Sequence, residues 1–125
     1  SEALPLVNEI RNRAARSTTL VFDYGASFKV EPYTMAEWTD RDIAMRDLKW
    51  ERRLELALEG SRFFDLVRWG DAAKVMNQYY ASEASRRSYY SDANFTAGKN
   101  EYLPIPQKQI NYSGGLYQQN NGWEK

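Results

Sequence analysis

The sequence lacks two residue types on which much enzyme chemistry depends: none of its 125 residues is cysteine or histidine. Disulfide bonds, thiolate zinc sites, cysteine nucleophiles and every mechanism that uses imidazole are therefore excluded. Carboxylate-bridged metal pairs also normally include histidine ligands. Carboxylates, tyrosine, lysine and arginine remain for chemistry, and we expect no metal or other cofactor.

The chain also lacks an excess of charge and a long apolar run. Lys plus Arg and Asp plus Glu both count 17, which gives a formal net charge of zero. A phosphate-binding surface needs clustered basic charge, so we expect no nucleic-acid partner. No apolar run approaches the roughly 20 residues of a membrane helix. Because the first residues already follow a helical pattern, we expect a fragment of a longer protein.

Apolar residues at helical spacing predict four helices, over residues 3–16, 40–59, 62–69 and 72–81. Thr39, with Asp42 three positions later, is the expected N-cap of the second helix, and Gly60 its expected end. Ser61 is the expected cap of the third helix. These elements predict a mainly α fold in a single segment covering residues 1–125.

The remaining residues predict loops. Two β-prone runs, residues 19–22 and 28–30, favour a small β-hairpin or an irregular excursion. From residue 82 the sequence is polar and rich in tyrosine, which predicts a surface loop. Residues 101–110 are expected to be extended because Pro104 and Pro106 lack amide donors and push their predecessors out of the helical region.

Acids, arginines and large apolar side chains are crowded together in residues 50–71, "WERRLELALEGSRFFDLVRWGD". On a helical wheel Glu51 and Glu55 lie between two apolar patches, which predicts that both are enclosed. With Asp47 and Glu59 they form a row of acids at a spacing of four, which is repulsive without positive partners. Because an unpaired buried charge costs several kcal/mol, we expect arginines near in sequence to pair with them. The expected structural ion-pair network comprises Glu51, Glu55, Arg62, Asp65 and Arg68.

The same glutamates allow a second interpretation, a glycoside hydrolase in which Glu51 and Glu55 are the acid and the base. That chemistry needs two carboxyl groups roughly 5 to 9.5 Å apart that flank the scissile bond. Two glutamates four residues apart on one helix point the same way and cannot easily face each other across a sugar. We therefore favour the structural interpretation and a protein that is not an enzyme.

Aromatic residues are abundant, with nine tyrosines and four tryptophans. Rigid rings with a polar tip are good platforms for sugars, which have apolar faces and hydroxyl rims. The candidate ligand contacts in irregular stretches are Tyr33, Trp38, Tyr89 and Tyr90. The alternative is that these rings pack loops against the core. The protein would then be a helical module that binds only other proteins.

Three segments, taken together, resemble the carboxyl-terminal part of the SusD/RagB family. "ERRLELALEGSRFFDLVRWGDA" is similar to the family hallmark, usually ERR-x-ELAFEG-x-R-[FWY]-x-DL-x-RWG. "NEIRNRAA" resembles the upstream helix of the family, and "KNEYLPIPQKQINYSGGLYQQNNGW" its closing segment. The segments also occur in the expected order, which makes the joint match far more specific than any one of them.

The resemblance implies a helical, SusD-like carboxyl-terminal region without the amino-terminal TPR-like part of the family. It implies a non-catalytic outer-membrane lipoprotein on the cell surface that captures glycans or other nutrient oligomers. Its partner would be a SusC-like TonB-dependent transporter. The lipid anchor would lie in the missing amino-terminal region. The hallmark motif would be scaffold, so no binding residue is carried over from the family.

Overall fold

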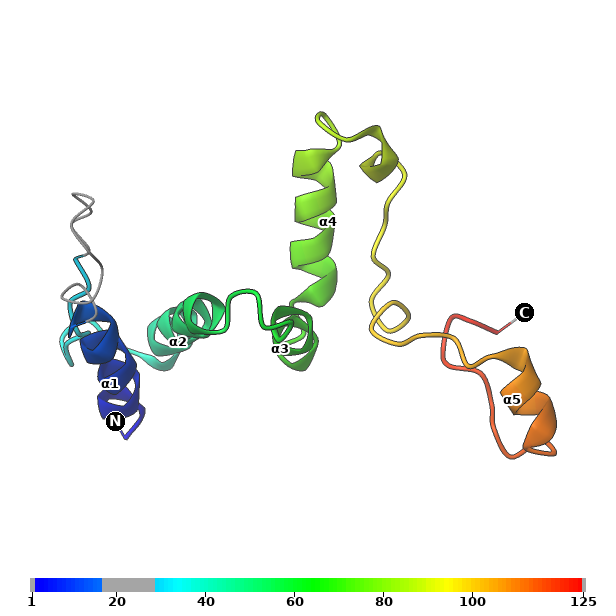
Figure 1. Ribbon diagram of the computed structural model, residues 1–125, viewed down its shortest axis with the longest axis horizontal. Coiled ribbons are helices and arrows are strands. Elements are labelled where there is room, and N and C mark those ends of the chain that lie inside the picture. Colours follow the sequence, from blue (N-terminus) through cyan, green and yellow to red (C-terminus); the bar gives the residue numbers. More distant parts are fainter. Residues whose placement is uncertain (1, 17–28, 125) are drawn as a thin grey trace. The chain divides into compact units, whose positions relative to one another are not determined.

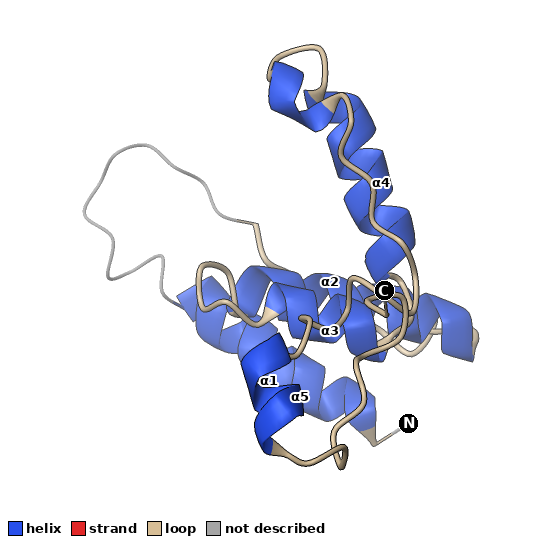
Figure 2. Cartoon of the chain, turned by 90° about the vertical axis from the view of Figure 1, so that its right-hand side faces the viewer, coloured by secondary structure: helices blue, strands red, loops and turns tan. Residues whose placement is uncertain are grey.

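The structure, a computed structural model, describes residues 2–16 and 29–124. In these ranges it contains helices and loops without a β-strand, so the expected mainly α fold is confirmed (Figures 1 and 2). The hairpin expected over residues 19–30 falls outside the described residues except at Lys29 and Val30, which are not in a strand. The elements are α1 (Ala3–Arg16), α2 (Arg41–Glu55), α3 (Arg62–Arg68), α4 (Ala72–Glu83), the 3-10 helix η2 (Ser88–Tyr90) and α5 (Gln107–Tyr112).

The chain divides into two compact units, Ser1–Ala57 and Leu58–Lys125. The core of the first unit consists of Leu4 and Val7 from α1 and Trp38 from the loop before α2. Leu4 and Val7 are three residues apart and therefore lie on the same face of α1. Ala44 and Leu48 of α2 pack against this cluster. Each helix of the unit thus contributes one apolar face to a small core.

The start of α2 is one residue later than the sequence predicted. Asp40, not Thr39, is the N-cap, with an extended backbone and a carboxylate that accepts from the amides of Asp42 and Ile43, both at 2.9 Å. One oxygen of a charged acceptor thereby satisfies two of the amides that have no partner within the helix.

The end of α2 is earlier than predicted, at Glu55 rather than at residue 59. Residues 56–60 form turns, and Leu58 has a left-handed backbone with a φ of 68°, which is rare for a residue with a side chain. Leu58 is fully exposed, and Leu54 and Trp50 are also exposed. The prediction that apolar patches cover both sides of the glutamates is therefore wrong near the end of α2, where Leu54 and Leu58 are exposed.

The second unit is built around α3 and α4. Its buried core consists of Leu66 from α3, Ala72 from α4 and Phe95 from the loop that follows η2. Gly70, with a φ of 73°, lets the chain turn sharply between the two helices. After η2 the chain returns alongside α4, as Figure 1 shows. The stretch from residue 82 was predicted as a surface loop, but it contains the last two residues of α4 and the whole of η2.

Three side-chain amides hold the loops in place by the same arrangement, which we call a two-point amide clamp. In each clamp one side-chain amide donates to the backbone carbonyl of a distant residue and accepts from the amide of that same residue. This geometry imitates the pairing of a β-bridge without a second strand. The three clamps, with distances of 2.7 to 2.9 Å, join Asn8 to Tyr33, Asn77 to Phe95 and Gln119 to Ile105.

The closing segment is helical where the sequence predicted an extended chain. Residues 103–106 are irregular, as two prolines require, but Gln107–Tyr112 forms α5. Pro106 is the N-cap, and its carbonyl accepts from the amide of Gln109 at 2.8 Å. Proline is well tolerated at a helix start, because its missing N–H would have no helical partner there. The extended prediction was therefore wrong after Pro106.

The clamp at Asn77 allows a direct test. Replacing Asn77 by alanine is expected to lower the free energy of unfolding by about 2 kcal/mol, because it leaves the backbone amide and carbonyl of buried Phe95 without partners. The measurement is urea unfolding followed by circular dichroism. Gln78→Ala, an exposed neighbour on the same helix, is the control and should change little. A loss below about 0.5 kcal/mol at Asn77 would contradict the clamp.

Candidate functional site

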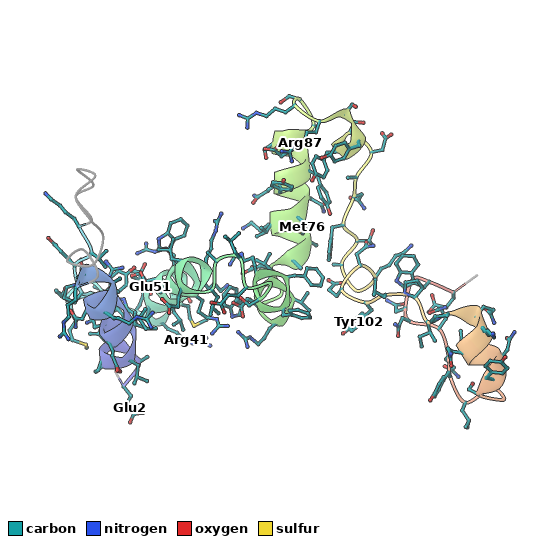
Figure 3. The ribbon with its side chains drawn as sticks, in the orientation of Figure 1. Glu2, Arg41, Glu51, Met76, Arg87 and Tyr102 are labelled. Carbon is teal, nitrogen blue, oxygen red and sulfur yellow. The ribbon has the colours of Figure 1, made fainter. Side chains whose placement is uncertain are left out.

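Glu51, from the charged stretch of residues 50–71, is buried inside the first unit. The side chain of Glu51 is only 8% exposed, and its Oε1 forms an ion pair with Arg11 of α1. The same oxygen accepts a hydrogen bond from the hydroxyl of Tyr33 at 3.0 Å. Figure 3 shows Glu51 on the part of α2 near α1. The carboxylate is thus enclosed and paired, as its place between apolar patches predicted.

Arg11 connects three separate parts of the first unit. Besides Glu51, its Nε donates to the backbone carbonyl of Glu31 at 2.5 Å. Its guanidinium carbon lies 4.1 Å from the centroid of the Tyr33 ring, a favourable cation–π position. The Arg11 side chain is 17% exposed, so its charge is largely withdrawn from water. We call Arg11, Tyr33 and Glu51 the buried network.

Glu55 differs from Glu51, although the two are one helical turn apart. It pairs with Arg13 of α1, but its side chain is 36% exposed and that of Arg13 is 68% exposed. The prediction that Glu55 is enclosed is therefore wrong, because α2 ends at this residue and no further turn covers it. Each of the two glutamates has an arginine partner on α1, about 40 positions earlier in the sequence.

Sequence reasoning noted Asp47 only as one of a row of acids, yet it is buried. Its Oδ1 accepts from the Nε of Arg46 at 2.9 Å and lies 2.8 Å from Arg46 Nη2. Because adjacent residues on a helix do not face each other, spacing gave no signal for this pair. The Arg46 side chain is long enough to fold over onto the carboxylate of the residue that follows it.

The expected acid of α3, Asp65, is also buried, and its Oδ1 accepts from Arg68 Nη2 at 2.6 Å. This is the pairing at a spacing of three along the helix. The guanidinium carbons of Arg62 and Arg68 lie 5.9 and 6.0 Å from the Trp69 ring. Within the second unit Arg68 thus pairs with an acid, whereas the predicted network member Arg62 lies near the Trp69 ring.

Two of the four candidate ligand contacts lie in the first unit and are engaged there. Trp38 is part of the buried core, and its ring lies 6.0 Å from that of Tyr33. Tyr33 is half-buried, hydrogen-bonded to Glu51 and held by the Asn8 clamp. Both rings fasten the loop before α2 to the rest of the unit.

The other two candidates, Tyr89 and Tyr90, belong to a group of rings at the end of α4. The ring of Tyr90 lies 4.5 Å from Tyr89 and 5.5 Å from both Tyr79 and Tyr80. Tyr89 is 69% exposed, and Tyr79 is also exposed. We call these four residues the tyrosine cluster. Arg87, labelled in Figure 3, lies at the same end of α4.

The hydroxyl groups of the cluster shift one another's pKa values. Hydrogen bonding with Tyr79 is the main cause that lowers the pKa of Tyr90. The same interaction raises the pKa of Tyr79, and desolvation is the main cause that raises that of Tyr89. The ring of Tyr89 remains open to solvent.

Because Tyr33 belongs to the buried network, we predict that the free energy of unfolding decreases at high pH. Burial, and then the hydrogen bond to the Glu51 carboxylate, raise the pKa of Tyr33 to about 12, from 10.0 in an unstructured chain. Between about pH 10 and pH 12 the unfolded state loses this proton while the folded state keeps it. Stability from this group is therefore complete below about pH 10 and is lost as pH rises through about 12.

We expect this change to be about 1 kcal/mol, because water reaches part of the ring and reduces the roughly 2.7 kcal/mol that a two-unit shift represents. The measurement compares urea unfolding of the wild type and Tyr33→Phe at pH 9 and pH 11.5. The wild type should lose more stability than the variant between these values. Equal losses would show that the folded environment of Tyr33 does not favour its protonated form.

Within residues 2–16 and 29–124, no group of three or more acidic, cysteine or histidine side chains is gathered to hold a metal ion. None of the helices in these ranges is long and apolar enough to cross a membrane.

Comparison with known proteins identifies the chain at the level of its family. A search among curated proteins found no match. The sequence model of the SusD family matches residues 1–123, a span that includes all three segments on which the resemblance was based. Members of this family are in general non-catalytic proteins of the outer-membrane surface that bind nutrients such as glycans and associate with SusC-like transporters. Because the match covers nearly the whole sequence, the chain belongs to the SusD family.

Proposed function

We propose that the protein captures glycans at the cell surface without catalysis and hands them to a SusC-like TonB-dependent transporter. The tyrosine cluster is the observation that carries this proposal. It presents the exposed ring of Tyr89 in η2, packed against the ring of Tyr90, which in turn contacts two rings of α4. A sugar ring can stack on such a face while its hydroxyls bond at the rim.

Pre-orientation of the cluster favours binding over simple loop packing. Tyr90 stacks on Tyr80 with an angle of 21° between the rings, and Tyr79 meets Tyr90 edge to face. Tyr89 is therefore held by neighbours that are themselves fixed to α4. Little side-chain freedom remains to be lost when a ligand arrives, which improves affinity. We propose Tyr89 and Tyr90 as the ligand contacts and leave the buried Trp38 out of the site.

The state of the two glutamates supports a protein that binds without hydrolysing. Glu51 and Glu55 each accept an arginine of α1, and Glu51 also accepts the Tyr33 hydroxyl. A catalytic pair must flank the scissile bond and exchange protons with substrate or water. These carboxylates instead extend from one helix toward another. We assign them to holding α1 and α2 together.

We further propose that the protein reaches the outer membrane through a lipid anchor attached amino-terminal to this chain. Family membership supports this location and the transporter partner. Lipid labelling of the expressed protein with radioactive palmitate, followed by membrane fractionation, tests the anchor. An unlabelled protein that remains in the soluble fraction would contradict it.

Binding and hydrolysis can be separated in one experiment on the intact protein. Calorimetric titration with maltohexaose, cellohexaose and xylohexaose should give saturable binding to at least one of them. Chromatography of the same mixtures should show every oligosaccharide intact after a day. The absence of binding to all of them would contradict the proposal. So would the release of shorter sugars, if Glu55→Gln abolished it.

A further inference from the structure

The end of the closing segment, residues 99–123, contains a pair of residues suited to a spontaneous reaction of the chain with itself. Asn121 is the only asparagine in the sequence that is followed directly by glycine. The backbone nitrogen of the next residue can attack the side-chain amide carbon of an asparagine and close a five-membered ring. Glycine has no side chain to obstruct this approach or to restrict the backbone rotation that it requires. Asn121 is therefore the asparagine of this chain at which ring closure is least hindered.

The side chain of Asn121 is free to leave its present position. Asn121 and Gly122 are both exposed, and the Asn121 Nδ2 donates to the carbonyl of Gly98 at 3.1 Å. A single bond between exposed groups is weak, because water competes for both partners. The turn around Gly122 is closed by the bond from the Trp123 amide to the Asn120 carbonyl, at 3.0 Å. Local opening of this turn lets the side-chain amide meet the next backbone nitrogen.

A carboxylate lies beside the nitrogen that would attack. The backbone amide of Gly122 donates to Oε2 of Glu124 at 2.7 Å. This nitrogen must lose its proton when it bonds to carbon, and a carboxylate within hydrogen-bond reach of that proton is in the position of a general base. Because Glu124 is only two positions from Gly122, the contact is local and can persist when the turn opens. The nucleophile and its base therefore come from one short stretch of chain.

The bond from Asn121 belongs to a set of contacts that join the two ends of the closing segment. Trp123 Nε1 donates to the carbonyls of Lys99 and Tyr102, both at 3.2 Å, and Lys99 Nζ lies 4.6 Å from the centroid of the Trp123 ring. The packing is close, since a Cβ atom on Gly122 would lie 3.0 Å from the Lys99 side chain. A carboxylate at position 121 has no hydrogen to donate, and an isoaspartate adds an atom to the backbone of the turn. Either product weakens this junction.

We propose that Asn121 is a site of spontaneous deamidation and that its product loosens the junction between the two ends of the closing segment. The Gly122 nitrogen bonds to Asn121 Cγ as the bond from Cγ to Nδ2 breaks. The proton that Glu124 accepts from Gly122 passes to Nδ2, which leaves as ammonia. Water then opens the resulting succinimide at either carbonyl and gives aspartate or isoaspartate. The net reaction consumes one water, releases one ammonia and involves no oxidation. It goes beyond the proposed function and requires no ligand.

Peptide mapping of the intact protein after incubation at pH 8 and 37 °C tests the site. The tryptic peptide of residues 109–125 also contains Asn111 and Asn120, which serve as internal controls. We expect Asn121 to exchange its amide for a carboxylate at least about tenfold faster than either control, because only Asn121 precedes glycine. Chromatography should resolve an aspartate and an isoaspartate form. In water labelled with oxygen-18, the product should carry one labelled oxygen.

Variants separate the reacting amide from the base. Asn121→Gln keeps an amide but would need a larger ring, so reaction at this position should fall at least about tenfold. Glu124→Gln should slow the reaction of Asn121 at least about threefold, because the amide of glutamine is a much weaker base than a carboxylate. Glu59→Gln removes another exposed acid of the second unit and should leave the rate unchanged.

Limited tryptic digestion measures the loosening of the junction. The carbonyl of Lys99 accepts from Trp123, so cleavage after Lys99 should be slow in fresh protein. Deamidated protein should be cleaved there at least about threefold faster, since local opening exposes the bond to the protease. Incubated Asn121→Gln should be cleaved at the rate of its fresh form.

Each part of the proposal has a result that overturns it. Reaction at Asn121 no faster than at Asn111 and Asn120 would overturn the modification site. Equal rates for the wild type and Glu124→Gln would overturn the assignment of Glu124 as the base. Equal cleavage after Lys99 in fresh and deamidated protein would overturn the loosening. None of these measurements involves a glycan, so their failure is distinguishable from failure of the proposed function.

Discussion

A Glu51→Ala variant is expected to unfold with a free energy about 3 to 5 kcal/mol below that of the wild type. The substitution removes the partner of Arg11, whose side chain is largely buried, and the acceptor of the Tyr33 hydroxyl. Removing one member of a buried pair leaves the other charge without compensation, and this cost exceeds that of losing an exposed contact. It is a large fraction of the stability of a typical domain.

The matched control lies one turn away on the same helix. Glu55→Ala removes the same kind of side chain from an exposed ion pair with Arg13, and we expect a loss of less than about 1 kcal/mol. Both values come from guanidinium unfolding monitored by tryptophan fluorescence. Similar losses for the two variants would mean that the buried network does not hold the first unit. If Glu51→Ala is as stable as the wild type, Glu51 becomes a candidate catalytic residue again.

Tyr89→Ala is expected to weaken glycan binding about 10- to 100-fold in calorimetric titration with whichever oligosaccharide the wild type binds. Truncation of a central aromatic contact at a binding surface costs roughly 1.4 to 2.8 kcal/mol, which corresponds to this range. The ring is 69% exposed and has few packing contacts to lose, so stability should change little. Tyr89→Phe keeps the stacking face and should weaken binding less than alanine does.

Another exposed tyrosine of the second unit provides the control for this experiment. Tyr117 lies outside the tyrosine cluster, and Tyr117→Ala should leave affinity unchanged. Tyr90→Ala removes the ring that contacts the other three members of the cluster, so it should weaken binding by loosening the platform. If Tyr89→Ala and Tyr90→Ala both bind glycan like the wild type, the cluster is not the site. A helical module that meets only protein partners would then be favoured.

Local patterns predicted the helices better than they predicted the partners of charged residues. The bounds of α1 are those predicted from the spacing of apolar residues in its sequence, because this spacing is a local property of the chain. The enclosure of Glu51 also followed from its place on the helix. Its partner did not, because Arg11 is 40 positions away and only the fold brings it close. Glu55 was wrongly predicted to be enclosed, because no clear signal in the sequence marks the early end of α2 at this residue.

The loops show a second limit of sequence reasoning. Asn8, Asn77 and Gln119 each clamp a distant backbone, yet an asparagine or glutamine in the sequence has no marker of such a role. The tyrosine-rich stretch supplied two candidate ligand contacts, Tyr89 and Tyr90, and their role in binding stays a prediction. The packing of three other rings around Tyr90 required the structure, since Tyr79 and Tyr90 are separated by the turn between α4 and η2.

The central claim is that the buried network supports the fold, whereas the tyrosine cluster binds the ligand. The most direct test is calorimetric titration of folded Glu51→Gln and folded Tyr89→Ala with the same oligosaccharide. We predict wild-type affinity for Glu51→Gln, despite a lower unfolding midpoint, and an affinity at least about tenfold weaker for Tyr89→Ala. The reverse pattern, with binding lost in Glu51→Gln and kept in Tyr89→Ala, would contradict this division of roles.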